Sequence, residues 1–351
     1  MVIAGLGTAA PTHCYAQQEC WDTLQHAPEF HALNSRSRAL LKKILTGRNG
    51  IESRHLALAS LAQAFDLQPD ALHRRFLENA PLLATQAAER ALHDANTTPP
   101  QIDAVIISTC TGYLCPGLTS YVAERLGLRP DVLALDLVGQ GCAAATPNFR
   151  AAEALLAAGR AQRVLSICVE ICSAAFYFDD DPGVLISACL FGDGAGAAVL
   201  ANSAPGRRRM EWKLAGSILD PRQRDLLRFE QRGGMLRNLL SIQVPPLAAD
   251  CARRVLDETL ARAQLRLEDI RSWIFHPGGR DILSALQARF GLSEAHLRWS
   301  AAVLRQYGNL SSASVFFVLQ AALTDSLPSG YCWMSSFGAG FSGHGALWEL
   351  E

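Results

Sequence analysis

The strongest constraint on the fold is an alternation of short apolar runs with longer Ala/Leu/Arg-rich segments. Several runs are apolar at almost every position, which is typical of strands whose two sheet faces are both covered by helices. The predicted strands are Ala104–Ser108, Val132–Val138, Val164–Glu170, Gly196–Leu200, Trp273–His276, Cys332–Phe337 and Gly345–Leu350. The predicted helices are Leu82–Ala95, Thr119–Leu126, Ala144–Ala158, Leu247–Ala263, Ile282–Phe290 and Ser312–Thr324. This alternation predicts an α/β layered architecture.

A polar stretch with Pro, Gly and Arg, Asn202–Arg209, is the best candidate for a boundary inside the 351-residue chain. We therefore predict an N-terminal half, residues 1–206, and a C-terminal half, residues 207–351. Each half ends in a glycine-rich strand signal, Phe-Gly-Asp-Gly-Ala-Gly from position 191 and Phe-Gly-Ala-Gly-Phe-Ser-Gly from position 337. The similarity of these two motifs predicts an internal duplication.

The composition excludes several functional classes. Hydrophobic residues make up 49% and charged residues 19% of the chain, which predicts a compact globular protein. A net charge of −1 gives no reason to expect a nucleic-acid partner. The first residues resemble a strand rather than a signal peptide, and no apolar run is long enough to span a bilayer. Most of the ten cysteines lie in apolar runs, which predicts reduced thiols and a cytoplasmic location.

Cys142 is the candidate nucleophile. It follows a predicted strand and opens a predicted helix, in the sequence Val-Gly-Gln-Gly-Cys-Ala-Ala-Ala. The N-terminus of a helix favours a thiolate, and the small neighbours permit close approach of a substrate. A buried structural cysteine is the alternative interpretation.

Two further polar residues stand in small-residue contexts. His276 ends an apolar run before Pro-Gly-Gly, and Asn309 lies in Tyr-Gly-Asn-Leu-Ser-Ser before an apolar helix. A core histidine and a helix-capping asparagine are the plain alternatives. With Cys142 they supply a thiol, an imidazole and a carboxamide, which together hold an acyl thioester and stabilise a negative oxygen beside it. This set favours carbon–carbon bond formation over hydrolysis.

In this order and with these flanks, the three residues resemble the type III polyketide synthases, the chalcone-synthase-like family of condensing enzymes. The resemblance covers essentially the whole chain, and Leu-Phe-Gly-Asp-Gly-Ala from position 190 and Ile-Phe-His-Pro-Gly-Gly from position 274 are among its most specific motifs. It implies an α/β, thiolase-like five-layered αβαβα fold from two duplicated halves, and a homodimer. It also implies an acyltransferase that uses acyl-CoA and malonyl-CoA as substrates, without a metal or other cofactor.

The resemblance also assigns roles. Cys142 would carry the acyl chain, while His276 and Asn309 would bind the thioester carbonyl of malonyl-CoA and stabilise the enolate that decarboxylation leaves. Phe191 matches the family's gatekeeper aromatic, although an ordinary core phenylalanine is the alternative. Phe275 would point to the opposite sheet face from His276 and is expected in the core.

A basic segment, Arg36–Arg54, holds six Lys and Arg residues against one acid and is a candidate clamp for the CoA phosphates. A solvated helix face is the usual explanation for such a run. Arg48 best matches a CoA-contacting lysine of the family, and Lys42 and Lys43 are weaker candidates. The glycines after His276, Gly278 and Gly279, complete the predicted CoA site.

Cavity positions depart from the plant members of the family in one direction. The predicted cavity residues besides Phe191 are Cys110, Thr111, Cys115, Cys172, Ala175 and Asn238. Three of them replace small hydroxyl residues, Cys115 replaces a residue that reaches into the partner's cavity, and Asn238 replaces a large aromatic. Burying an unpaired hydroxyl costs roughly 1–3 kcal/mol, so these walls favour an aliphatic chain. Bacterial members that accept long acyl groups are similar around Cys172. We therefore expect a medium- or long-chain fatty acyl-CoA starter and an alkylpyrone or alkylresorcinol product.

Three alternatives remain open from the sequence. A β-ketoacyl-carrier-protein synthase III also uses Cys, His and Asn, although the Gly-Gln-Gly-Cys flank, the His-Pro-Gly-Gly turn and the chain length favour the polyketide synthase. A thiolase needs a second catalytic cysteine late in the chain, and Cys332 lies in an apolar strand instead. A catalytically silent partner subunit would be expected to have lost the nucleophile.

Overall fold

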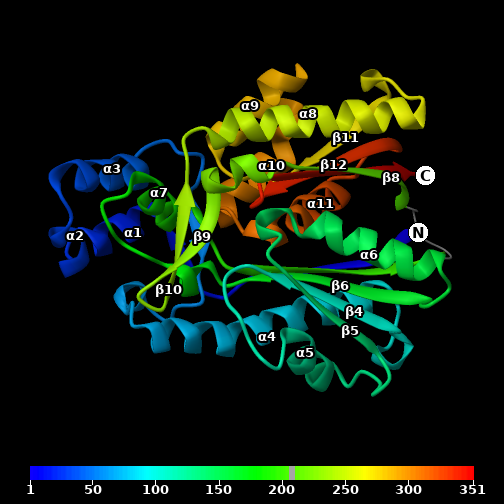
Figure 1. Cartoon of the computed structure of the whole chain (residues 1–351), viewed down its shortest axis with the longest axis horizontal. Coiled ribbons are helices and arrows are strands. Elements are labelled where there is room, and N and C mark those ends of the chain that lie inside the picture. The colour runs from blue at the N-terminus through cyan, green and yellow to red at the C-terminus, as the bar shows by residue number, and fades with distance from the viewer. Residues whose placement is uncertain (205–209) are drawn as a thin grey trace.

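A nine-stranded sheet forms the frame of the protein, in a computed structural model that describes residues 1–204 and 210–351 (Figure 1). The strand order is β11-β12-β13-β8-β1-β7-β6-β4-β5. In sequence order the strands are β1 (Val2–Ala9), β4 (Ala104–Thr109), β5 (Leu133–Val138), β6 (Arg163–Glu170), β7 (Gly194–Ala201), β8 (Met210–Leu219), β11 (Ile270–Phe275), β12 (Gly330–Gly338) and β13 (Ser342–Leu350). The predicted boundary after residue 206 lies outside the described residues.

The sheet consists of two half-sheets in a five-layered arrangement. Within the described ranges, the pair Val2–Glu211 joins β1 to β8, and the strands on either side of this junction form separate layers (Figure 1). Helices α6 (Ala145–Ala157) and α11 (Ser314–Thr324) lie between the layers (Figure 1). The outer faces are covered by α4 (Pro69–Asp94) and α5 (Leu118–Leu126) on one side, and by α8 (Val244–Ala263) and α9 (Arg280–Phe290) on the other. This is the αβαβα order that the family resemblance implies.

The two halves repeat one topology. In the first, β1 and β6 pair antiparallel with β7, and β6 pairs parallel with β4. In the second, β8 and β12 pair antiparallel with β13, and β12 pairs parallel with β11. The central helices α6 and α11 occupy equivalent positions in the two halves. The pairing therefore agrees with an internal duplication.

The central layer is held by aromatic packing. The ring of Phe149 on α6 lies 5.5 Å from the ring of Phe316 on α11 and 5.7 Å from that of Trp348 on β13. All three side chains are fully buried. Because both central helices bury apolar side chains against both half-sheets, their positions are fixed by the core.

Smaller elements gather at one end of the sheet, at the left of Figure 1. They are β2 (Cys14–Ala16), α1 (Gln17–Leu24), α2 (Pro28–Ala32), α3 (Ser35–Thr46), β3 (Ser53–His55), α7 (Pro182–Leu190), β9 (Leu227–Arg232) and β10 (Met235–Leu240). Helix α10 (Glu294–Tyr307) packs beside α11. None of the helices in the described ranges combines the length and the apolar composition that crossing a bilayer requires.

The structure differs from the sequence prediction in several places, and the small elements β2, β3, α1–α3 and α7 are additions to it. Helix α4 begins at Pro69 rather than Leu82, because Pro81 lies within the helix instead of ending it. Strand β5 is the sheet edge and leaves Leu133 and Val138 exposed, whereas its apolar run predicts burial on both faces. Helix α10 and strands β8–β10 are absent from the prediction.

The close packing of the C-terminal half-sheet gives the first testable prediction. A Cβ on Gly345 would lie 2.1 Å from a ring carbon of the fully buried Trp333. We expect Gly345→Ala to lower the free energy of unfolding by about 3 kcal/mol, since neither strand can move apart without opening the core.

Gly291→Ala is the matched control in urea unfolding measurements. Gly291 has a φ of +70° but no atom within 4 Å of a Cβ, so only backbone strain of about 1 kcal/mol is expected. Equal losses for the two variants would contradict the packing argument.

Candidate active site

Cys142 lies where the sequence places it, between a strand and a helix. It follows β5 in the short 3-10 turn Gly141–Ala143, directly before α6. Gly141 has a φ of +56°, and a Cβ there would lie 3.0 Å from the backbone nitrogen of Ala339. The glycine before the nucleophile is therefore required by both the turn and the glycine-rich C-terminal segment.

A chain of contacts links the three predicted catalytic residues. The hydroxyl of Ser311 donates to Sγ of Cys142 at 3.2 Å, and the backbone N–H of Ser311 donates to Oδ1 of Asn309 at 2.8 Å. Nδ2 of Asn309 donates to the carbonyl of Gly278 at 3.1 Å. Nε2 of His276 faces the same glycine, because a Cβ built on Gly278 would lie 3.4 Å from it. Residues from both halves of the chain thus meet at one site.

The imidazole of His276 is held at the end of β11. Only 1% of the residue is exposed, its backbone N–H donates to the carbonyl of Ser335 at 2.9 Å, and its ring packs edge-on against Phe337. Nδ1 has no hydrogen-bond partner among the described residues. Phe275, the preceding residue, points into the outer core beside Trp273 and Phe290, as predicted.

Burial controls the protonation of both ionisable groups. It raises the pKa of Cys142 to about 12, against the lowering effect of the Ser311 hydroxyl and with a further rise from Glu170. It lowers the pKa of His276 to about 3. The helix N-terminus favours a thiolate, but desolvation has the larger effect on the Cys142 pKa. In such a site, an ionised thiol needs a cation beside it, because attraction is strong at low dielectric.

Sequence reasoning missed a buried carboxylate next to the nucleophile. Glu170, at the end of β6, is fully buried and accepts hydrogen bonds from the backbone N–H of Cys110 at 3.0 Å, from Thr111 at 2.9 Å and from the Ser312 hydroxyl. Burial raises the pKa of Glu170. The available signal is an acid that closes an otherwise apolar predicted strand.

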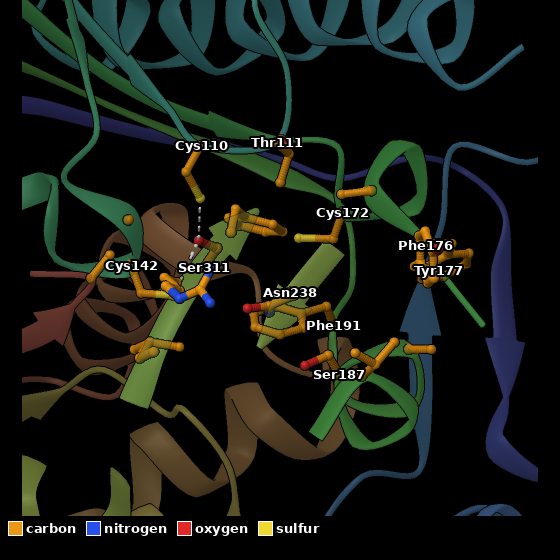
Figure 2. A pocket seen from close by; sticks show the side chains of 18 residues that line it. Cys110, Thr111, Cys142, Cys172, Phe176, Tyr177, Ser187, Phe191, Asn238 and Ser311 are labelled. Carbon is orange, nitrogen blue, oxygen red and sulfur yellow. Dashed lines mark hydrogen bonds between the residues drawn. The ribbon is translucent and has the colours of Figure 1, made fainter. Parts of the chain in front are cut away.

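A cavity opens beside Cys142 (Figure 2). Its lining includes Cys142 and Ser311, together with these predicted cavity residues: Cys110, Thr111, Cys172, Ala175, Phe191 and Asn238. Phe176 and Tyr177 lie on the side opposite Cys142. Cys115 is exposed on the surface and is not part of this lining. Its reach into a partner's cavity stays a prediction.

The backbone ties Phe191 to the asparagine. The N–H of Gly192 donates to the carbonyl of Asn309 at 3.0 Å, and the N–H of Asn309 donates to the carbonyl of Leu190 at 2.9 Å. A Cβ on Gly192 would lie 2.3 Å from the carbonyl oxygen of Tyr307. The Phe-Gly-Asp-Gly motif therefore lets two segments from different halves approach closely.

The basic residues of the predicted CoA site lie on the surface, whereas Gly279 is buried. Lys42 and Lys43 are exposed on α3, and Arg48 is exposed just beyond its end. The guanidinium of Arg280, which follows Gly279, donates to the carbonyl of Arg48. The structure thus brings the Arg48 loop next to Gly278 and Gly279, while CoA binding itself remains a prediction.

Comparisons with known proteins identify the family. Residues 11–223 match the family described as "FAE1/Type III polyketide synthase-like protein", and residues 229–342 match "Chalcone and stilbene synthases, C-terminal domain". The chain belongs to the type III polyketide synthases, with their thiolase-like fold. It is an acyltransferase that condenses malonyl-CoA and takes CoA thioesters as substrates. This membership decides against the β-ketoacyl-carrier-protein synthase III and thiolase alternatives.

Two curated relatives and one solved structure show the range of similarity. The 1,3,6,8-tetrahydroxynaphthalene synthase of Streptomyces peucetius subsp. caesius is 30% identical, over 97% of this chain and 90% of that protein. The alpha-pyrone synthesis polyketide synthase-like Pks18 of Mycobacterium tuberculosis is 28% identical, over 99% and 91%. The crystal structure of PKS-I from the brown alga Ectocarpus siliculosus superimposes with a TM-score of 0.90 at 28% identity, over 100% and 98%.

The protonation of Cys142 gives a second prediction. If His276 takes the thiol proton, iodoacetamide should alkylate Cys142 at a rate that varies little between pH 6 and pH 9. In His276→Gln the thiol has no such base and its pKa is raised by burial, so the rate should rise about tenfold per pH unit.

Mass spectrometry of the Cys142 peptide measures both rates, and surface-exposed Cys14 serves as the internal control. Parallel pH profiles for the parent protein and the variant would show that His276 does not act on the thiol.

Proposed function

We propose that the protein extends a medium- or long-chain fatty acyl-CoA starter, held on Cys142, and releases an alkylpyrone or alkylresorcinol. The observation that carries the starter assignment is the cavity wall beside Cys142. Cys110, Cys172 and Ala175 offer thiols and a methyl group to the substrate, and Phe176 and Val184 add hydrocarbon. Such a wall packs against methylene groups, whereas it would leave the hydroxyls of a ring without hydrogen-bond partners.

The proposed chemistry begins with transfer of the starter. The Cys142 thiolate attacks the acyl-CoA carbonyl, an S–C bond forms, and CoA leaves as its thiolate. His276 takes the thiol proton, which offsets the high pKa that burial gives Cys142. The Ser311 hydroxyl, 3.2 Å from Sγ, supports the thiolate through its hydrogen bond.

Extension follows through decarboxylation. The C–C bond to the malonyl carboxylate breaks, CO₂ leaves, and the electron pair forms an enolate whose oxygen accepts hydrogen bonds from His276 and Asn309. Nδ2 of Asn309 uses one N–H on Gly278 and keeps a second for the substrate. Removing one such donor typically costs on the order of 10²–10³ in rate. The enolate carbon then attacks the Cys142 thioester and expels the thiolate, which lengthens the chain by two carbons.

The proposed entrance for CoA is the basic surface near Gly278 and Gly279. Lys42, Lys43 and Arg48 supply positive charge there, and the exposed Arg280 adds a fourth cation. Phosphates favour such clusters of basic side chains. In this arrangement Phe191 stands between the entrance and the acyl cavity.

A starter panel tests the proposal. Purified protein with malonyl-CoA and C8–C18 acyl-CoAs should yield alkylated pyrones or resorcinols by mass spectrometry, and aromatic acyl-CoAs should react poorly. Cys142→Ala should yield no product with any starter. Efficient extension of aromatic starters without use of C8–C18 chains, or a product made from malonyl-CoA alone, would exclude the proposed starter class.

The exposed edge of β5 supports the proposal of a homodimer. This edge strand exposes Leu133 by 42% and Val138 by 58%, and an unpaired strand edge readily pairs with another chain. A second copy would cover both the apolar side chains and the free backbone groups. A homodimer would also give the exposed Cys115 a partner cavity to reach.

Light scattering after size exclusion tests the dimer. Val138→Lys should shift the protein to a monomer at micromolar concentration, because a charge would be buried in the contact. Ile242→Lys, at a site that is 92% exposed outside β5, is the control and should leave the mass unchanged. A monomeric parent protein would rule out the proposed assembly.

A further inference from the structure

We propose that Asn238 binds the keto oxygen that each condensation adds to the growing chain, and that Arg237, the residue before it, positions it for this contact. Both roles rest on the proposed function, because they require a chain that is held on Cys142 and extended there. After one extension, the chain carries a ketone that the starter lacks. A polar contact at Asn238 therefore acts on the later extensions and not on the loading of the starter.

The carboxamide of Asn238 has an unused hydrogen-bonding atom in the cavity. Its side chain lines the cavity beside Cys142 (Figure 2), and the residue is only 6% exposed. Oδ1 of Asn238 has no hydrogen-bond partner among the described residues. The hydroxyls of Thr111 and Ser311, which also line the cavity, donate to the carboxylate of Glu170 at 2.9 Å and 3.3 Å. Because a buried polar atom without a partner is costly, a substrate that supplies the partner is favoured.

A carboxamide suits both forms of a β-keto group. A ketone accepts a hydrogen bond, which Nδ2 of Asn238 can donate, whereas the enol form donates one, which Oδ1 can accept. The terminal torsion of an asparagine is broad and roughly two-fold, so a half-turn exchanges the two atoms. A saturated starter chain offers neither a donor nor an acceptor, and it therefore gains nothing from this residue.

Arg237 and Asn238 are consecutive residues of β10, so their side chains point to opposite faces of the β9–β10 hairpin. Asn238 faces the cavity. On the other face, three acids surround the guanidinium of Arg237, whose side chain is 9% exposed. It donates to Asp179 at 2.7 Å and to Glu230 at 2.9 Å, and lies 3.3 Å from the carboxylate of Asp181.

These ion pairs join the hairpin to helix α7. Asp181 is the N-cap of α7 and accepts a hydrogen bond from the N–H of Gly183 at 2.8 Å. At the same end of the helix, a Cβ on Gly183 would lie 2.2 Å from the carbonyl oxygen of Leu240, the last residue of β10. Arg237 therefore fixes the hairpin against α7, and with it the place at which Asn238 enters the cavity.

The number of extensions tests the role of Asn238. Asn238→Leu keeps the side-chain volume and removes both polar atoms. It should lower the ratio of products with two or more extensions to those with one about tenfold, and leave the rate at which dodecanoyl-CoA acylates Cys142 within about twofold. Mass spectrometry of the products and of the intact protein measures the two values. An unchanged ratio would overturn the proposal, whereas failure of the parent protein to acylate Cys142 would overturn the proposed function itself.

Variants of Arg237 test whether it acts through Asn238. Arg237→Met should lower the same ratio, and Arg237→Lys, which keeps the positive charge, should recover part of it. The double variant Arg237→Met/Asn238→Leu should lower the ratio no further than Asn238→Leu alone. Arg254→Met removes an exposed ion pair with Glu258 on α8 and is the control that should change neither value. Equal losses of acylation and extension in Arg237→Met, or losses that multiply in the double variant, would overturn the positioning role.

A measurement on the unmodified protein covers the case in which a variant fails to fold. Cys142 is loaded from 3-oxododecanoyl-CoA that carries carbon-13 at the ketone, in the absence of malonyl-CoA. The infrared band of this ketone should lie at a lower frequency than in the same thioester in an aprotic solvent, because a hydrogen bond weakens the carbonyl bond. A band at the aprotic frequency would show that no donor reaches the ketone and would overturn the contact with Asn238.

Discussion

The contact between the two central helices is the constraint on which the active site depends. The rings of Phe149 and Phe316 hold α6 against α11 at the centre of the molecule. Cys142 precedes the first of these helices, and Asn309 and Ser311 precede the second. Packing in the core therefore brings the N-terminal ends of two duplicated helices together and sets the distance between thiol and hydroxyl.

Burial disfavours the charged forms of both ionisable groups at this site. The same desolvation that raises the pKa of Cys142 lowers that of His276, so the neutral forms of both groups are favoured in the absence of each other's charge. A charge must therefore be made as a pair, because attraction between opposite charges is strong at low dielectric. Glu170 adds a fixed acceptor that organises Thr111 and Ser312 around the nucleophile.

A structural feature could be predicted from the sequence where it requires a recognisable local pattern of residues. Cys142 and Asn309 follow glycines that the packing requires, Gly141 and Gly308, so these motifs could be singled out as candidates without coordinates. The sequence does not single out Ser311, because its hydroxyl donates to a residue of the other half, Cys142. A serine beside a helix is usually interpreted as a helix cap. Helices α1–α3 were not predicted, because such short segments carry little helical periodicity.

The junction between the two half-sheets affects the geometry of the candidate site. Among residues 1–204 and 210–351, one backbone pair, Val2 with Glu211, joins the two half-sheets edge to edge. Cys142 travels with one half and Asn309 with the other. The packing between the layers therefore sets the gap between Cys142 and Asn309, and the interlayer contacts that stabilise the fold also hold the two residues at one site.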